Sequence, residues 1–96
     1  MANDIARKLR KHAREIKEKF FVKEIGIFGS QIRGKAKRKS DIDILVEFEE
    51  SGETFDNYME LKLFLEKIFN KRVDLVLKDV LKEEIKEAIL ADVVYV

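Results

Sequence analysis

One segment, residues 41–48 (DIDILVEF), constrains the fold more than any other because its apolar and polar side chains alternate. Successive side chains of a β-strand point to opposite faces of the sheet, so one face of this segment is apolar. The members of that face are Ile42, Ile44, Val46 and Phe48. The opposite face begins with Asp41 and Asp43. The pattern predicts a strand that covers a core on one side and presents two carboxylates on the other.

The remaining segments alternate between helical and strand-like spacing of their apolar residues. Helices are expected at residues 4–20, 55–69 and about 80–90, the last capped by Asp79 and led by Leu81, Ile85 and Ala88. Strands are expected at residues 22–28 and 72–77, with an edge strand at 93–96, a short helix at 31–35 and a polar turn at 49–54. The order α-β-(α)-β-α-β-α-(β) predicts an α/β (α+β) fold, a small mixed sheet flanked by helices.

The composition restricts the chemistry. The chain has 96 residues, so residues 1–96 are expected to form a single domain. It has no Cys and one His, so a bound metal must be held by oxygen, as Mg²⁺, Mn²⁺ and Ca²⁺ are. No signal peptide is visible and no apolar run approaches about 18 residues, so no membrane contact is expected and the expected location is cytoplasmic.

Asp41 and Asp43 are the first candidates for a metal site. Two residues apart on a strand, their Cα atoms would lie about 6.6–6.8 Å from each other, with both carboxylates on one face. Asp74 lies on the polar face of the strand expected at 72–77. If the two strands are neighbours, three carboxylates gather on one surface and repel one another. A shared divalent cation removes that repulsion, so the cluster favours a metal site.

Gly29-Ser30 directly follows the first expected strand and is the candidate phosphate site. Glycine permits a tight turn and a close backbone approach, and a helix start offers free N–H donors to phosphate. The GxxxxGK[ST] pattern of a Walker loop is absent from the chain. The combination of residues predicts a triphosphate held at one end, with a metal cluster beside it.

The segment GSQIRGKAKRKSDIDILVEF resembles the signature GS-x(10)-D-x-D of the DNA polymerase β-like nucleotidyltransferase superfamily. It is most similar to the minimal nucleotidyltransferases (MNT) that act as antitoxins beside HEPN ribonuclease toxins. The resemblance covers nearly the whole chain and implies a role for each candidate. Gly29 and Ser30 would bind the β- and γ-phosphates, and Asp41 and Asp43 would hold two Mg²⁺ ions. Asp74 would bind the catalytic ion and help to deprotonate the acceptor hydroxyl.

The resemblance also implies the substrates and the partner. A nucleoside monophosphate, AMP from ATP, would move to a tyrosine hydroxyl of a HEPN toxin and silence it. Arg33 would neutralise phosphate charge, unless it is a solvated turn residue. Because larger family members carry an extra acceptor-binding domain, the acceptor surface here would come from another molecule or from a homo-oligomer. The alternatives are an antitoxin that acts by contact alone and an enzyme that modifies a small molecule.

The charge is distributed unevenly between the two parts of the chain. Residues 1–40 hold 13 Lys/Arg against 4 Asp/Glu, whereas residues 41–96 hold 7 against 15. This asymmetry indicates either a charged partner or mutual neutralisation of the two parts in the fold, and both readings stay open. Nucleic acid is one such partner, because a basic first helix and the basic run at 33–39 could contact phosphate.

Overall fold

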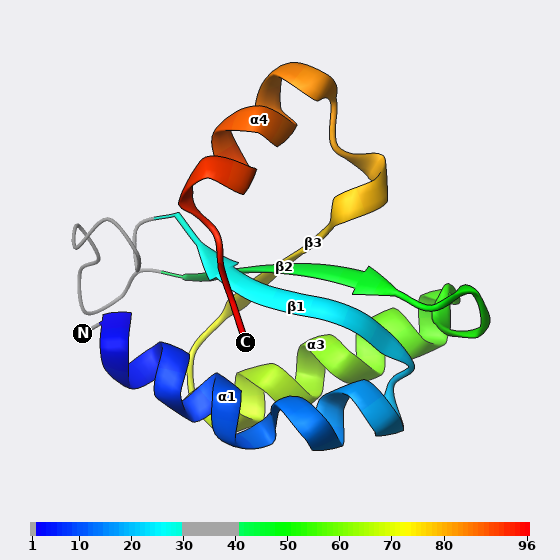
Figure 1. The fold of residues 1–96 in the computed structure, drawn as a ribbon. Helices are drawn as coiled ribbons and strands as arrows, with labels where there is room; N and C mark the ends of the chain where they lie inside the picture. Colours follow the sequence, from blue (N-terminus) through cyan, green and yellow to red (C-terminus); the bar gives the residue numbers. More distant parts are fainter. Residues whose placement is uncertain (1, 30–40) are drawn as a thin grey trace.

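The computed structural model describes residues 2–29 and 41–96, with the side chains of residues 2 and 3 left aside. Its centre is a four-stranded sheet in the order β3-β2-β1-β4. Figure 1 shows α1 and α3 on one side of this sheet and α4 on the other. The strands are β1 (Val22–Phe28), β2 (Ile42–Phe48), β3 (Val73–Leu77) and β4 (Val94–Tyr95). The helices are α1 (Ala2–Lys19), α3 (Phe55–Phe69) and α4 (Glu83–Asp92), with short 3₁₀ helices η1 (Glu50–Gly52) and η2 (Lys78–Val80).

The sheet is mixed, which confirms the expected fold class. β1 runs antiparallel to β2 and to β4, whereas β2 and β3 are parallel. Parallel neighbours require a crossover connection, and here α3 supplies it between β2 and β3. The crossover brings the strand that carries Asp74 directly beside the strand that carries Asp43.

The core lies between the sheet and the layer formed by α1 and α3. The apolar face of β2 is fully buried there, as the alternation at 41–48 predicts. Leu9 and Ile16 of α1 and Leu61 and Leu65 of α3 are each 0% exposed. The apolar stripes of both helices therefore face one side of the sheet, and their polar residues face solvent.

Local signals hold the two ends of α3. Thr54 is the N-cap, and its hydroxyl accepts a 3.1 Å hydrogen bond from the backbone N–H of Asn57. Asn70 ends the helix in the left-handed conformation, with φ 52°. The Asn57 amide donates to the carbonyl oxygens of Phe20 (2.7 Å) and Gly52 (2.9 Å). These hydrogen bonds connect the start of α3 to the residue after α1 and to η1.

Three local expectations need correction. Asp41 precedes β2 rather than beginning it, because the strand pairing starts at Ile42, whose N–H donates to the Arg72 carbonyl. Asp79 lies in η2 and does not cap the last helix, which starts later, after Lys82. That helix, α4, has no buried residue. Ile85, which was expected to lead its apolar side, is 51% exposed. The short helix expected at 31–35 lies outside the described residues.

Candidate active site

The face of the sheet turned away from α1 and α3 is built of three rows of side chains across β1, β2 and β3. Residues paired in register share a face, so each row follows from the strand pairing. The first row is Phe28, Asp43 and Asp74, the second is Gly26, Leu45 and Val76, and the third is Glu24 and Glu47, which Lys78 of η2 joins through ion pairs. A carboxylate row and a charged row therefore flank an apolar one.

The first row brings together two of the three predicted carboxylates. Asp43 and Asp74 are direct register partners on parallel strands, so their Cα atoms lie about 4.8 Å apart and their side chains leave the same face. Asp43 is half-buried and Asp74 is exposed. Asp41 is exposed in the segment just before β2, two residues from Asp43.

Gly29 lies directly against the carboxylate of Asp43. Its φ is +79°, a conformation that suits glycine, and it is buried at the end of β1. A Cβ atom built at this position would collide with the Asp43 carboxylate, so no larger residue fits without displacing it. The predicted phosphate-binding turn and the predicted metal-binding strand therefore meet at this point. Ser30 and Arg33, the other two predicted nucleotide-binding residues, lie outside the described residues.

The donor set of the first row suits a hard cation, because its ligands are carboxylate oxygens. Within residues 2–29 and 41–96, no three acidic or His side chains already stand close enough to enclose an ion. Mg²⁺ does not need such a cage, since it commonly binds one or two carboxylates and completes its shell with water and substrate phosphate. The Asp43–Asp74 pair therefore meets the protein's share of a magnesium site.

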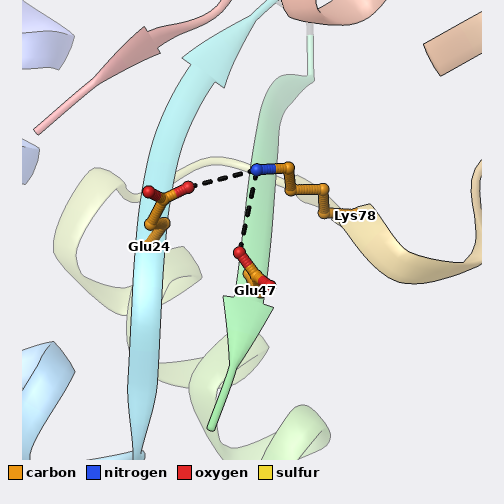
Figure 2. Close-up of polar contacts among 3 residues, drawn as sticks. All are labelled: Glu24, Glu47 and Lys78. Atoms are coloured by element: carbon orange, nitrogen blue, oxygen red, sulfur yellow. Dashed lines mark hydrogen bonds and ion pairs between the residues drawn. The ribbon is translucent and has the colours of Figure 1, made fainter.

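The third row contains an ion cluster that the sequence pattern did not identify (Figure 2). Lys78 Nζ donates a 3.2 Å hydrogen bond to Glu24 Oε2 and lies 3.7 Å from Glu47 Oε1. It also lies 5.6 Å from the centre of the Tyr95 ring. The hydrogen bond to Glu24, more than any other contact, raises the pKa of Lys78 above its ordinary value. Lys78 thus attaches η2 to the sheet, on the face that carries Asp43 and Asp74.

The period-two spacing could have identified part of this cluster. Glu47 lies four residues after Asp43 and Lys78 four residues after Asp74, so each shares a face with its carboxylate if strand geometry continues. Glu24 could be added only once the β1–β2 register was known.

None of the helices in the described part of the chain combines the length and apolarity needed to span a bilayer.

Comparison with known proteins identifies the family of the chain. Residues 9–96 match the family model of the nucleotidyltransferase domain. The protein adenylyltransferase MntA of Thermococcus cleftensis is 49% identical over 88 residues, which is 92% of this chain and 88% of the relative. A Methanocaldococcus jannaschii protein provisionally assigned the same activity is 43% identical over 96 residues, covering 98% and 96% of the two chains. The chain belongs to the nucleotidyltransferase domain family and is a nucleotidyltransferase.

Solved structures show the same architecture. A protein provisionally assigned as a minimal nucleotidyltransferase superposes with a TM-score of 0.80 at 34% identity, covering 92% of this chain and 89% of the other. The same fold also occurs in a crystal structure of a toxin–antitoxin complex with AMP-PNP, with a TM-score of 0.68. That likeness covers 98% of this chain and 70% of the other, at 24% identity, and concerns the fold alone.

Proposed function

We propose that this nucleotidyltransferase uses Mg²⁺ and ATP to attach AMP to a hydroxyl group of a partner protein. The register pairing of Asp43 with Asp74, with Gly29 against Asp43, is the observation that supports it most strongly. Two carboxylates and a backbone turn without a side chain offer a place for a metal ion beside a phosphate chain. The choice of AMP and of a protein acceptor follows the name of the Thermococcus cleftensis relative.

The residues of the proposed site divide into two groups. Asp41, Asp43 and Asp74 would hold two Mg²⁺ ions, which supply charge stabilisation for the entering and leaving oxygens at the α-phosphorus. Gly29 and Ser30 would hold the β- and γ-phosphates, with Arg33 neutralising phosphate charge. Asp74, exposed on the edge strand β3, is the carboxylate best placed to accept the proton of an incoming acceptor hydroxyl.

The partner in this proposal is a HEPN-type toxin, which the chain would silence as an antitoxin in the cytoplasm. The same fold is present in a crystal structure described as a tri-AMPylated Shewanella oneidensis HEPN toxin in complex with an MNT antitoxin. At 21% identity that complex shows a shared fold, with a TM-score of 0.67, and the partner is our inference for this chain. The proposal treats residues 1–96 as one catalytic domain.

Intact mass spectrometry of the partner tests the reaction. The purified chain, incubated with ATP, Mg²⁺ and the HEPN protein from the same organism, should add one or more AMP groups to it. Asp74→Asn should slow the transfer by at least about a hundredfold, because a metal ligand and proton acceptor is lost. The matched control is Asp4→Asn, an equally exposed aspartate in the first turn of α1, which should leave the rate unchanged.

Two results would contradict the proposal. An unmodified partner with the wild-type chain, ATP and Mg²⁺ would remove the transfer reaction. Full neutralisation of the toxin by Asp74→Asn, with no AMP attached, would instead support an antitoxin that acts by contact alone. Replacing ATP by GTP, CTP or UTP in the same assay would determine the base, and removing Mg²⁺ with a chelator should stop the reaction.

A further inference from the structure

An apolar groove lies beside β3, and its lining on this strand begins at Leu75. It has a volume of about 630 Å³ and lies between the first turn of α3 and η2, beside the end of β3. Phe48 and Leu75 form part of its floor, and Phe55 and Val80 stand at its rim. Phe55 is 76% exposed and Val80 is 71% exposed. Two large apolar side chains so exposed at one groove indicate a contact surface for another molecule.

The groove runs from the strand residues after Asp74 to the rim formed by Phe55 and Val80. Leu75 and Val76, the lining residues nearest to Asp74, follow it by one and two residues on β3, and Leu77 follows it by three, a distance of about 10 Å. Asp43 and Phe48 are five residues apart on β2, about 16–17 Å. Phe48 and Leu75 belong to the face covered by α1 and α3, whereas Val76 shares the face of both carboxylates. The exposed rim at Phe55 and Val80 is the part of the groove that lies away from the carboxylates.

Two backbone groups on the outer edge of β3 are already hydrogen-bonded by side chains, which disfavours pairing with an added strand. The Val73 N–H donates to Glu66 Oε2 at 3.0 Å, and the Leu75 carbonyl accepts from the Tyr58 hydroxyl at 2.7 Å. Side chains of α3 thus already satisfy backbone groups along the outer side of this edge strand. An occupant has to enter with its own side chains rather than by backbone pairing.

The charge of the groove selects the occupant. Glu53 and Asp79 are lining residues, and no Lys or Arg from the described part of the chain lines the groove. A segment that fits has apolar side chains for the floor and Lys or Arg beside them for the rim. A protein acceptor also needs contacts beyond its reacting hydroxyl, because a single hydroxyl at the carboxylates supplies little affinity.

We propose that this groove anchors the acceptor protein through an apolar segment flanked by Lys or Arg, an inference that rests on the proposed function. The partner would contact the groove and pass around the β3 edge, so that its hydroxyl reaches Asp74 on the far face. Recognition then centres on the rim at Phe55 and Val80, and chemistry centres on Asp74 at the start of β3. Substitutions at the rim should change affinity, and substitutions at Asp74 should change the rate of transfer.

Phe55→Asp is the principal test, with Leu63→Asp as its matched control. Both residues are exposed on α3, Leu63 at 59%, but only Phe55 lines the groove. In the Asp74→Asn background, where the transfer is expected to be strongly slowed, Phe55→Asp should weaken binding of the acceptor protein by at least about tenfold. Leu63→Asp should change it by less than about twofold. Equal affinities for the two variants would overturn the proposal.

A second probe does not depend on the acceptor protein. A synthetic amphipathic helix with Leu on one face and Lys on the other should bind the wild-type chain more tightly than its Leu/Glu counterpart. Phe55→Asp should abolish the binding, and reversal of both groove charges (Glu53→Lys with Asp79→Lys) should invert the preference. No preference, or a preference that Phe55→Asp leaves intact, would overturn the chemistry assigned to the groove.

The two probes separate the failure of this inference from failure of the proposed function. If the acceptor is neither bound nor modified by the wild-type chain but the Leu/Lys helix binds in the groove, the proposed function fails and the chemistry of the groove stands. If Phe55→Asp lowers the oligomeric state of the isolated chain in sedimentation, the groove holds a second copy and the anchoring of the acceptor is wrong.

Discussion

The two faces of the sheet differ in what covers them. On one side α1 and α3 bury long apolar stripes against β1, β2 and β3. On the other side stands α4, which buries none of its residues. Figure 1 shows this helix standing apart from the sheet, joined to it through η2 and β4.

This difference separates stability from chemistry. The apolar area that α1 and α3 remove from water stabilises the fold, and Leu45 and Phe28 are buried on the opposite face as well. That opposite face also carries Asp43 and Asp74 side by side as register partners. The two carboxylates therefore lie on the face that carries the smaller share of the core.

The largest expected effect compares one aliphatic truncation on each side. Leu65→Ala removes a fully buried side chain of α3 and should lower the free energy of unfolding by about 2–5 kcal/mol, because a cavity remains. Ile85→Ala on α4 removes a side chain that is 51% exposed and should cost less than about 1 kcal/mol. Urea unfolding followed by circular dichroism measures both. Similar losses of stability in the two variants would mean that α4 is part of the core and that the two sides of the sheet do not differ.

An intermediate effect is expected at Gly29, where the two groups of site residues meet. Gly29→Ala places a side chain at φ +79°, at a cost of about 1–3 kcal/mol, and pushes against the Asp43 carboxylate. We expect the folded Gly29→Ala variant to transfer AMP more slowly than the wild type. Asn70→Ala, at φ 52° and the end of α3, is the control for backbone strain. It should lose stability but keep its rate, and a normal rate for Gly29→Ala would separate Gly29 from the site.

The smallest effect is expected at Lys78, which attaches η2 to the sheet face. Lys78→Met keeps the aliphatic part of the side chain, loses the ion pair and should cost about 0.5–1 kcal/mol at neutral pH. Because the hydrogen bond to Glu24 raises the pKa of Lys78 above 10.5 in the folded chain, its contribution is complete below that pH. It is lost as the pH rises through the raised pKa.

Urea unfolding at neutral pH and above pH 10.5 measures the difference between wild type and Lys78→Met. The difference should shrink at high pH. A Glu24→Gln variant, alone and combined with Lys78→Met, isolates the contribution of the pair in a double-mutant cycle. A constant difference across this range would show that Lys78 acts through packing instead of charge.

Much of the fold could be predicted because its signals are local. The alternation at 41–48 identified β2 and its buried face, and the spacing at 55–69 identified α3 within its observed bounds. The predicted start of α4 was wrong. Asp79 is a residue type that often caps helices, but here the backbone around it forms η2. Ile85 was expected to lead the apolar side of this helix, but no residue of α4 is buried.

The candidate site was only partly predictable, because some of its residues are close in the sequence and others are far apart. Asp41, Asp43 and Gly29 are close in sequence, so their spacing could indicate one site. The groove between α3 and η2 joins Phe55 to Val80, which no short pattern connects. The cluster of Glu24, Glu47 and Lys78 likewise draws on three separate elements.

The amino-acid sequence alone determined which residues could form helices and strands, and which face of β2 would carry carboxylates, because side-chain periodicity is a property of neighbouring residues. Only the tertiary structure decided that Asp74 would be the register partner of Asp43. That pairing depends on the parallel crossover through α3, which brings together residues about thirty positions apart. It also decided which face α1 and α3 would cover, since both helices bury their apolar stripes against the same side of the sheet.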